Sequence, residues 1–366
     1  MACLMVFLQH GIRRAFLYVP IENTIWERLL NVICNGGFGV SIFFVLSGFL
    51  ITYLLITEHE LNSKISLKRF YIRRTLRIWP LYFLIMLFSF LIYPFLQSLI
   101  STNNHPLGSN ILYHLTFLSN FDVINITKNC DEKATLMKII NWSVSIEEQF
   151  YLFWPLIFLL PKRTWIYAIL LVIISSITFR ILHYNDVTVL YFNTIAVLVD
   201  LAMGGLVAYL IKTNNSIRAF FENSSTITHI ILFACTFCFL FWIDLLYTFK
   251  YGAAIARIGI SISFALIIAA QAITTSESKL NLSNISFANK WGKYTYGIYL
   301  IHPIPLALLD VGIRILHISS TNFITSLIIG MIAFILTLIL SKMSYIYFES
   351  KFLILKDKFS VIKTLG

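Results

Sequence analysis

The chain has 366 residues, of which 58% are hydrophobic and 16% aromatic, and its mean hydropathy is +0.81. Charged residues make up 12% of it, whereas a soluble domain carries about 25%. These values exclude a soluble enzyme with a single anchor and predict an all-α polytopic membrane protein. The net charge of +11 does not indicate a nucleic-acid partner, because the basic residues lie in loops between apolar runs.

Ten apolar runs are long enough to cross a membrane, which takes about 20 residues of helix. They lie near residues 2–19, 38–57, 79–100, 142–160, 164–183, 190–211, 227–248, 252–274, 294–316 and 322–347. About ten transmembrane helices would place both termini on one side, together with eighteen of the 28 Lys and Arg residues. The positive-inside rule makes that side cytoplasmic.

A weaker run at 108–125 contains several polar residues. Counting it as a span would send the later basic residues to the opposite face from the earlier ones, so we expect 101–141 to be an extracytoplasmic excursion. The first run is short before its arginines, because eight apolar residues rise only about 12 Å. Either Gly11–Val19 completes this span despite Arg13 and Arg14, or residues precede Met1.

An arginine stripe precedes the third run. Arg69, Arg73 and Arg77 are spaced by four residues, so they share a helix face, and Arg74 lies on its flank. Planar guanidinium groups suit bidentate contacts with phosphates. The alternative is ordinary anchoring of the helix at lipid headgroups.

Two adjacent carboxylates, Glu147 and Glu148, lie inside an apolar, aromatic run, where ionisable groups persist mainly because they pair or serve a function. We expect Glu147 a few residues inside the outer interface, away from the arginines, with Ser143 and Tyr151 on its helix face. It could orient a histidine, accept a hydrogen bond from an acceptor hydroxyl or bind a sugar. Glu148 points about 100° away and is expected to be structural.

The alternative for Glu147 is a structural ion pair with an embedded arginine such as Arg180 or Arg257. Small residues at Ser47 and Gly48 in an aromatic helix predict close approach of another backbone or a ligand. Cys235 and Cys238 form a C-x-x-C within an apolar run, where we expect two small helix residues and no metal site.

Two histidines fall within the apolar runs. His10 lies in the first run, and His302 lies beside Pro303 and Pro305, which interrupt the helix ladder and open room for a ligand. Histidine is a suitable general base near neutral pH. The alternative for each is a buried, hydrogen-bonded structural residue.

Four blocks of sequence together resemble the acyltransferase-3 family of integral-membrane O-acyltransferases, in the order and spacing of that family. They are GVSIFFVLSGFLIT (39–52), RFYIRRTLRIWPLY (69–82), WSVSIEEQFYLFWP (142–155) and YGIYLIHPIP (296–305). Members of the family move acyl groups, often acetyl from acetyl-CoA, onto hydroxyls of cell-surface glycans, peptidoglycan or antibiotics. The resemblance covers essentially the whole chain.

The resemblance implies roles for particular residues. His10 corresponds to the first-helix histidine of the family, and catalytic roles follow for His10, Glu147 and His302. On the donor side, Arg74 and Arg77 would bind the acyl-CoA phosphates, with Arg73 assisting. The supporting motif positions are Ser47, Gly48, Ser145, Tyr151 and Tyr299.

The chain departs from the family in two ways. The family usually carries a basic residue eleven positions before the first-helix histidine, and counting back from His10 gives position −1, which predicts residues upstream of Met1. Some relatives also carry a soluble esterase-like domain after the membrane part. We therefore expect that a separate extracytoplasmic partner completes the transfer.

The sequence thus predicts an acyltransferase domain at 1–350 and a basic cytoplasmic tail at 351–366, in a bacterial inner membrane. It predicts acyl-CoA as co-substrate without a bound cofactor, and a glycan or lipid-linked sugar as acceptor. His10 would act as general base or carry the acyl group transiently. The alternatives are a non-enzymatic transporter or flippase of lipid-linked sugars, and a degenerate, inactive homologue.

Overall fold

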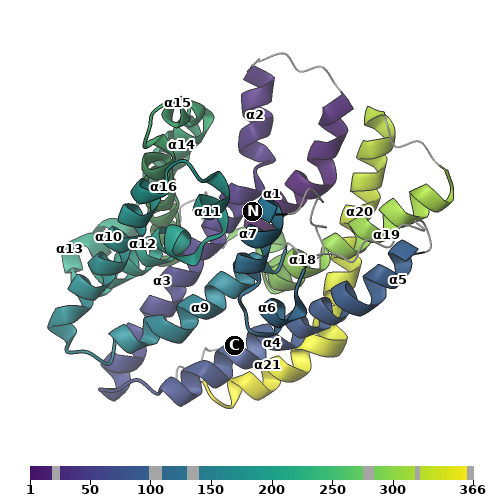
Figure 1. Ribbon diagram of the computed structural model, residues 1–366. Helices are drawn as coiled ribbons and strands as arrows, with labels where there is room; N and C mark the ends of the chain where they lie inside the picture. The colour runs from purple at the N-terminus through teal and green to yellow at the C-terminus, as the bar shows by residue number, and fades with distance from the viewer. Residues whose placement is uncertain (19–24, 99–108, 130–139, 275–283, 318–321, 361–366) are drawn as a thin grey trace.

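The computed structural model describes residues 1–18, 25–98, 109–129, 140–274, 284–317 and 322–360, and in these ranges the chain forms helices and no strand (Figure 1). The first half contains α1 (Ala2–Phe7), a π-helical turn η1 (Leu8–Ile12), a 3-10 segment η2 (Arg13–Tyr18), α2 (Ile25–Ile33), α3 (Gly36–Asn62), α4 (Leu67–Leu87), η3 (Phe88–Ile92), α5 (Tyr93–Ser98), α6 (Ile111–Leu115), α7 (Ser119–Asn129) and α9 (Trp142–Ile157). The second half contains η4 (Lys162–Thr164), α10 (Trp165–Leu182), α11 (Val187–Phe192), α12 (Thr194–Thr213), α13 (Asn215–Glu222), α14 (Thr226–Phe241), α15 (Asp244–Tyr247), α16 (Gly252–Ile273), α17 (Ser286–Gly292), α18 (Thr295–Ile301), α19 (Pro303–Ile315), α20 (Phe323–Ser344), η6 (Tyr345–Glu349) and α21 (Ser350–Asp357).

Seven helical segments of the described chain are long and apolar enough to cross a membrane. They are Ile25–Asn62, Leu67–Leu96, Lys162–Leu182, Val187–Thr213, Gly252–Ile273, Thr295–Ile315 and Phe323–Asp357. Helices α13 and α14, bent by 96° at a short break, would make an eighth. The sequence therefore correctly predicts a polytopic helical membrane protein, but fewer than the ten expected spans meet this length and composition criterion.

The two remaining predicted spans are helical but shorter or irregular. Helix α9 has 16 residues, which rise about 24 Å. Residues 2–18 form one helical run that changes type at η1, so the chain continues as a helix past Arg13 and Arg14. The weaker run at 108–125 is divided between α6 and α7, of 5 and 11 residues, and neither is long enough to span.

Helices α10 and α20 carry exposed apolar side chains along their outer faces, among them Leu171, Ile174, Ile324 and Ile328. Such surfaces are unfavourable in water and cost nothing against lipid tails. The low charge of the sequence and these faces together place the bundle in a membrane.

Helix α3 runs through the middle of the bundle and packs closely on α12 (Figure 1). A Cβ atom on Gly48 would lie 1.8 Å from the carbonyl oxygen of Leu201, and one on Gly204 would lie 1.9 Å from that of Val45. Only glycine permits this contact, since the two backbones touch. The predicted close approach at Gly48 is thus confirmed, and the neighbour is a helix backbone.

Helices α20, η6 and α21 form one continuous run, and α21 lies alongside α4 at the lower edge of Figure 1. The predicted domain boundary at 350 falls inside this run. The chain just beyond it also contacts α4, since Arg73 donates to the carbonyl oxygen of Phe359 at 2.9 Å. Residues 361–366 of the predicted tail lie outside the described part of the chain.

Candidate functional site

A cavity of about 370 Å³ lies between α3, α4, α9 and α18, and we call it the arginine cavity. On α3 its lining extends from Val40 to Leu54, which are fourteen helical steps and therefore about 21 Å apart along the helix axis. That is a large part of a hydrocarbon core about 30 Å thick. Its polar lining residues are Ser47, Arg74, Arg77, Ser143, Glu147, Tyr151, Thr295, Tyr296 and Tyr299.

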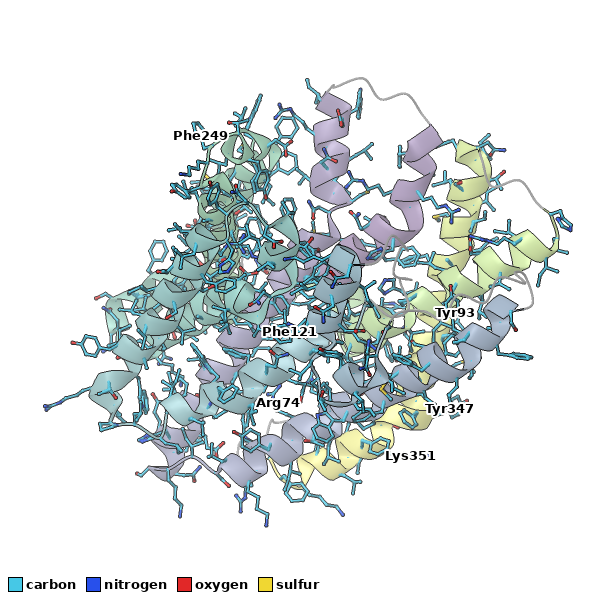
Figure 2. All side chains as sticks on the ribbon, viewed as in Figure 1. Arg74, Tyr93, Phe121, Phe249, Tyr347 and Lys351 are labelled. Atoms are coloured by element: carbon cyan, nitrogen blue, oxygen red, sulfur yellow. The ribbon has the colours of Figure 1, made fainter. Side chains whose placement is uncertain are left out.

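Arg74 and Arg77 enter this cavity from α4, and Arg74 is labelled in Figure 2. The guanidinium carbon of Arg74 lies 5.6 Å from the ring centroid of Tyr151 and 5.8 Å from that of Phe70, which holds it by cation–π contact. Its Nε atom is buried and has no hydrogen-bond partner in the described part of the chain. Arg77 is exposed in the same cavity. Two guanidinium groups therefore have donors available for a ligand.

Arg73 points elsewhere. It forms an ion pair with Glu58 at 3.1 Å, and Glu58 also accepts from the backbone nitrogen of Ser66 at 2.9 Å. Arg73 is absent from the lining of the arginine cavity. The prediction that Arg73 assists in donor binding is therefore not supported. The spacing of the arginines indicates a shared helix face, but it does not reveal that Glu58 on α3 pairs with Arg73.

Glu147 lies in the arginine cavity, where Ser47 donates to its Oε1 at 2.8 Å and Tyr151 to its Oε2 at 3.2 Å. The prediction that it lies away from the arginines is wrong. Helix α9 begins at Trp142, as the apolar run predicts, and Glu147 lies about 8 Å along its axis. The arginine cavity is long enough to include both this depth and the side chains of Arg74 and Arg77. Within the described residues its hydrogen-bond partners are these two hydroxyl groups and not a histidine.

Neither of the two arginines named for the alternative ion pair, Arg180 and Arg257, pairs with Glu147. Arg257 donates to Asp200 through Nε at 3.0 Å, and Arg180 donates to the backbone oxygens of Leu190, Ala196 and Ala253. Asp200 is fully buried. Sequence reasoning did not identify it as the partner of Arg257, although an isolated carboxylate in an apolar run was an available signal.

Glu148 and Ser145 lie outside the cavity lining. Glu148 accepts from Nε1 of Trp79 at 2.8 Å, which agrees with the structural role expected of it. Ser145 is buried, with its Oγ 2.7 Å from the Oγ of Ser119 on α7. It supports the packing of α9 and not the cavity.

A second cavity of about 360 Å³, which we call the histidine cavity, is lined by His10, Arg13, Asn35, Trp142, Tyr191, Tyr299 and their apolar neighbours. His10 lies in the π-helical turn η1, a distortion that occurs often at functional sites. Val40 and Tyr299 line both the arginine and the histidine cavity. The two cavities therefore meet at one wall.

Tyr299 links this wall to both histidines. Its hydroxyl oxygen lies 2.5 Å from Oγ of Ser143, and its carbonyl oxygen accepts from Nδ1 of His302 at 2.7 Å. Because a carbonyl cannot donate, neutral His302 carries its proton on Nδ1 and leaves Nε2 as an acceptor. The rings of His302 and His10 are stacked, with centroids 5.6 Å apart. The two predicted histidines are thus brought together from opposite ends of the chain.

Sequence reasoning missed two residues of the site. Tyr191 on α11 lines the histidine cavity, and Tyr296 on α18 lines the arginine cavity. Tyr296 belongs to a quoted motif, so its aromatic ring was an available signal. Tyr191 lies in an apolar run without any polar pattern, and no sequence signal distinguishes it.

Comparison with known proteins agrees with this arrangement. Residues 1–342 match the model of the acyltransferase-3 family, described as an acyltransferase domain. The chain is 29% identical over 313 residues to a protein named peptidoglycan O-acetyltransferase OatA from Listeria monocytogenes, covering 79% of this chain and 47% of that protein. It is 27% identical over 331 residues to YrhL of Bacillus subtilis, whose name assigns it the same reaction provisionally, covering 86% and 50%. The chain thus spans about half the length of these relatives, and no solved structure matches it.

Proposed function

The chain belongs to the acyltransferase-3 family, and from that premise we propose that it is an O-acyltransferase that moves an acyl group, such as acetyl, from acyl-CoA to a hydroxyl of a cell-surface glycan. The name of the Listeria relative supports an O-acetyl transfer and a glycan acceptor. The single observation that carries the proposal is the common wall of the two cavities, since Tyr299 and Val40 line both. One cavity offers guanidinium groups, and the other offers a histidine.

The proposed topology has ten spans in a bacterial inner membrane, with both termini cytoplasmic. The positions of the loop lysines and arginines support it. In this topology Leu54 and the start of α4 lie toward the cytoplasm, and Val40 lies toward the outside. Acyl-CoA enters the arginine cavity from the cytoplasm, where Arg74 and Arg77 bind its phosphates. The elongated cavity then directs the thioester toward Tyr299.

His10 acts as general base on the acceptor. It takes the proton of the attacking hydroxyl, whose oxygen forms a bond to the acyl carbon as the carbon–sulfur bond breaks. The leaving thiolate then takes that proton from His10. General-base assistance of this kind contributes about 10²–10⁴-fold to the rate. His302, fixed by its bond to the carbonyl of Tyr299, holds the ring of His10 by stacking.

Glu147 organises the donor cavity. It fixes Ser47 and Tyr151 by hydrogen bonds, and its charge balances the two guanidinium groups that share the cavity. A carboxylate held by two hydroxyl groups in this way is well suited to keep Arg74 in place when no acyl-CoA is bound.

The proposal is tested with inside-out membrane vesicles that contain the protein and are supplied with acetyl-CoA carrying a labelled acetyl group. We expect label on a glycan or lipid-linked sugar, with the mass increase of one acetyl group, and equal release of free CoA. A labelled lipid-linked sugar that crosses the membrane while acetyl-CoA is not consumed would instead establish a transporter and overturn the proposal.

A further inference from the structure

A third cavity, which we call the tyrosine cavity, lies at the end of the bundle where α10 ends and α16 begins. Its volume of about 640 Å³ exceeds that of either cavity described above. Its lining includes Arg180, Tyr184, Tyr191, Tyr247, Lys250 and Arg257. Phe249, also in the lining, marks this end of the molecule in Figure 2.

The tyrosine cavity adjoins the histidine cavity. Asn35, Gly37 and Tyr191 line both of them. The arginine, histidine and tyrosine cavities therefore form a row, with His10 in the middle one. Tyr191 and its neighbours separate the tyrosine cavity from the cavity that contains His10, and the tyrosine cavity shares no lining residue with the arginine cavity.

The lining of this cavity is basic. Arg180, Lys250 and Arg257 contribute to it, and none of the described lining residues is acidic. Arg257 is neutralised by Asp200, which also accepts from Ser261. Arg180 has no ion pair of its own in the described part of the chain. Two of its nitrogens donate to three backbone carbonyls, and Asp200 is near enough to attract this guanidinium group as well as that of Arg257.

Arg180 is 5% exposed, and its Nε atom has no hydrogen-bond partner in the part of the chain that the structure describes. One carboxylate, Asp200, thus serves two largely buried guanidinium groups, and a bound anion would balance the positive charge that remains. Lys250 is exposed, with its Nζ 5.2 Å from the ring centroids of Tyr184 and Tyr251. Its ammonium group can therefore contact the same anion from the exposed edge of the tyrosine cavity.

The remaining lining residues suit a sugar. Tyrosine and phenylalanine rings offer apolar faces to the C–H groups of a pyranose, while phenol and amide groups bond to its hydroxyls. Tyr184, Tyr191, Tyr247 and Asn185 provide these groups around the cavity.

We infer that the tyrosine cavity binds the acceptor, and that the acceptor is an anionic carbohydrate, a sugar that carries a carboxylate or a phosphate group. This inference rests on the proposed function, because His10 in the adjoining cavity gives the bound sugar its reaction partner. The anionic group lies at Arg180 and Lys250, and a hydroxyl of the same sugar reaches past Tyr191 to His10.

Binding of small probes to the purified full chain in detergent micelles tests this inference without any acyl transfer. Saturation-transfer NMR titrations use glucuronic acid, glucose 1-phosphate and glucose. We expect at least one of the two anionic sugars to bind about 10-fold or more tightly than glucose, as a charge-assisted hydrogen bond would produce. Whichever of the two anionic sugars binds more tightly shows whether the cavity recognises a carboxylate or a phosphate group.

Lys250→Ala and Arg180→Gln are each expected to weaken that binding by about 10-fold. Lys250 is exposed, so its substitution does not threaten folding. The matched control is Lys128→Ala, a lysine that pairs with Asp186 and lies outside the cavity lining. Equal binding of glucose and both anionic sugars, or unchanged binding in Lys250→Ala and Arg180→Gln, would overturn the inference. Inorganic phosphate is titrated separately and followed by phosphorus-31 NMR. Its binding, with no sugar bound, would also overturn the inference and indicate a lipid-headgroup site.

Acetyl-CoA binding is measured in the same samples. We expect it to be unchanged by Lys250→Ala. Sugar binding in a protein that does not bind acetyl-CoA would contradict the proposed function and leave the tyrosine cavity as a sugar site. Acetyl-CoA binding without selective binding of an anionic sugar would contradict this inference alone.

Discussion

The imidazole rings of His10 and His302 are stacked with their centroids 5.6 Å apart and their planes inclined by 22°. His10 lines the histidine cavity, whereas His302 is 1% exposed and bonds to the carbonyl of Tyr299. The first histidine is thus accessible to a substrate, and the second holds it in place. The proposed roles of base and positioning residue follow from this difference in exposure.

His302→Ala is expected to lower kcat by about 10–100-fold, with a small change in the KM for acetyl-CoA, because His10 loses the ring against which it is held. His302→Asn retains a donor near the position of Nδ1 and should recover part of the loss. Steady-state kinetics in detergent measure both. A large rise in KM with an unchanged kcat would contradict a positioning role.

Arg77→Ala is expected to raise the KM for acetyl-CoA by about 10–100-fold, since a hydrogen bond to a charged group contributes about 1.5–3 kcal/mol. The matched control is Arg73→Ala, from the same helix but outside the cavity lining. It should leave KM within about twofold and lower the thermal unfolding midpoint, because Glu58, which is buried, loses its ion pair. Equal effects of the two substitutions on KM would contradict donor binding in the arginine cavity.

Glu147→Gln is expected to reduce kcat/KM by about 10-fold, because the two guanidinium groups lose their balancing charge while hydrogen bonding to Ser47 and Tyr151 is only weakened. Glu148→Gln retains an acceptor for Trp79 and should stay within about twofold of the wild type. Acyl transfer by the two purified variants measures this contrast. Greater loss in Glu148→Gln would reverse the roles assigned to the adjacent carboxylates.

Asp122, on α7 outside the predicted spans, makes stability depend on pH. Burial alone raises its pKa, but hydrogen bonds from His114, Ser109 and the backbone of Asn110 outweigh burial and lower the pKa of Asp122 below its ordinary range. Its stabilising contribution is therefore complete above the unfolded pKa of about 3.9 and is lost as the pH falls through the lower folded pKa.

The thermal unfolding midpoint should therefore fall for the wild type between pH 5 and pH 3. Asp122→Asn should start lower at pH 5 and fall less over the same range. Asp357→Asn, at an exposed carboxylate, serves as control and should follow the wild type. Parallel curves for Asp122→Asn and the wild type would exclude Asp122 as the cause.

Much of the site could be predicted because its residues are polar or charged at positions where the surrounding sequence is apolar. Titratable groups in apolar runs, such as Glu147, His10 and His302, are costly enough to mark a function. The structure gathers them, together with Arg74 from the arginine stripe, around two adjoining cavities. The close packing at Gly48 was readable for a similar reason, since a glycine in a helix is unfavourable unless backbones meet there.

The parts of the site that could not be predicted depend on which side chains the tertiary packing brings together. The start of α9 at Trp142 agrees with the apolar run at 142–160, but the run does not show that Glu147 shares a cavity with Arg74 and Arg77. The spacing of the arginines grouped Arg73 with Arg77, but Glu58 on α3 draws Arg73 away and leaves Arg74 beside Arg77. The turn at η1 that presents His10 and the position of Tyr191 arise from tertiary packing, which residue patterns do not record.

Acyl transfer by a His10→Ala variant tests the central claim most directly. The variant and the wild type are compared in the same membranes for transfer of labelled acetyl from acetyl-CoA to the surface glycan, with His183→Ala, an exposed histidine outside the described cavity linings, as control. We predict that His10→Ala loses about 10²–10⁴-fold in transfer rate while it still folds and binds acetyl-CoA, and that His183→Ala is unaffected. Acetylation by a folded His10→Ala variant at the rate of the wild type would contradict the account.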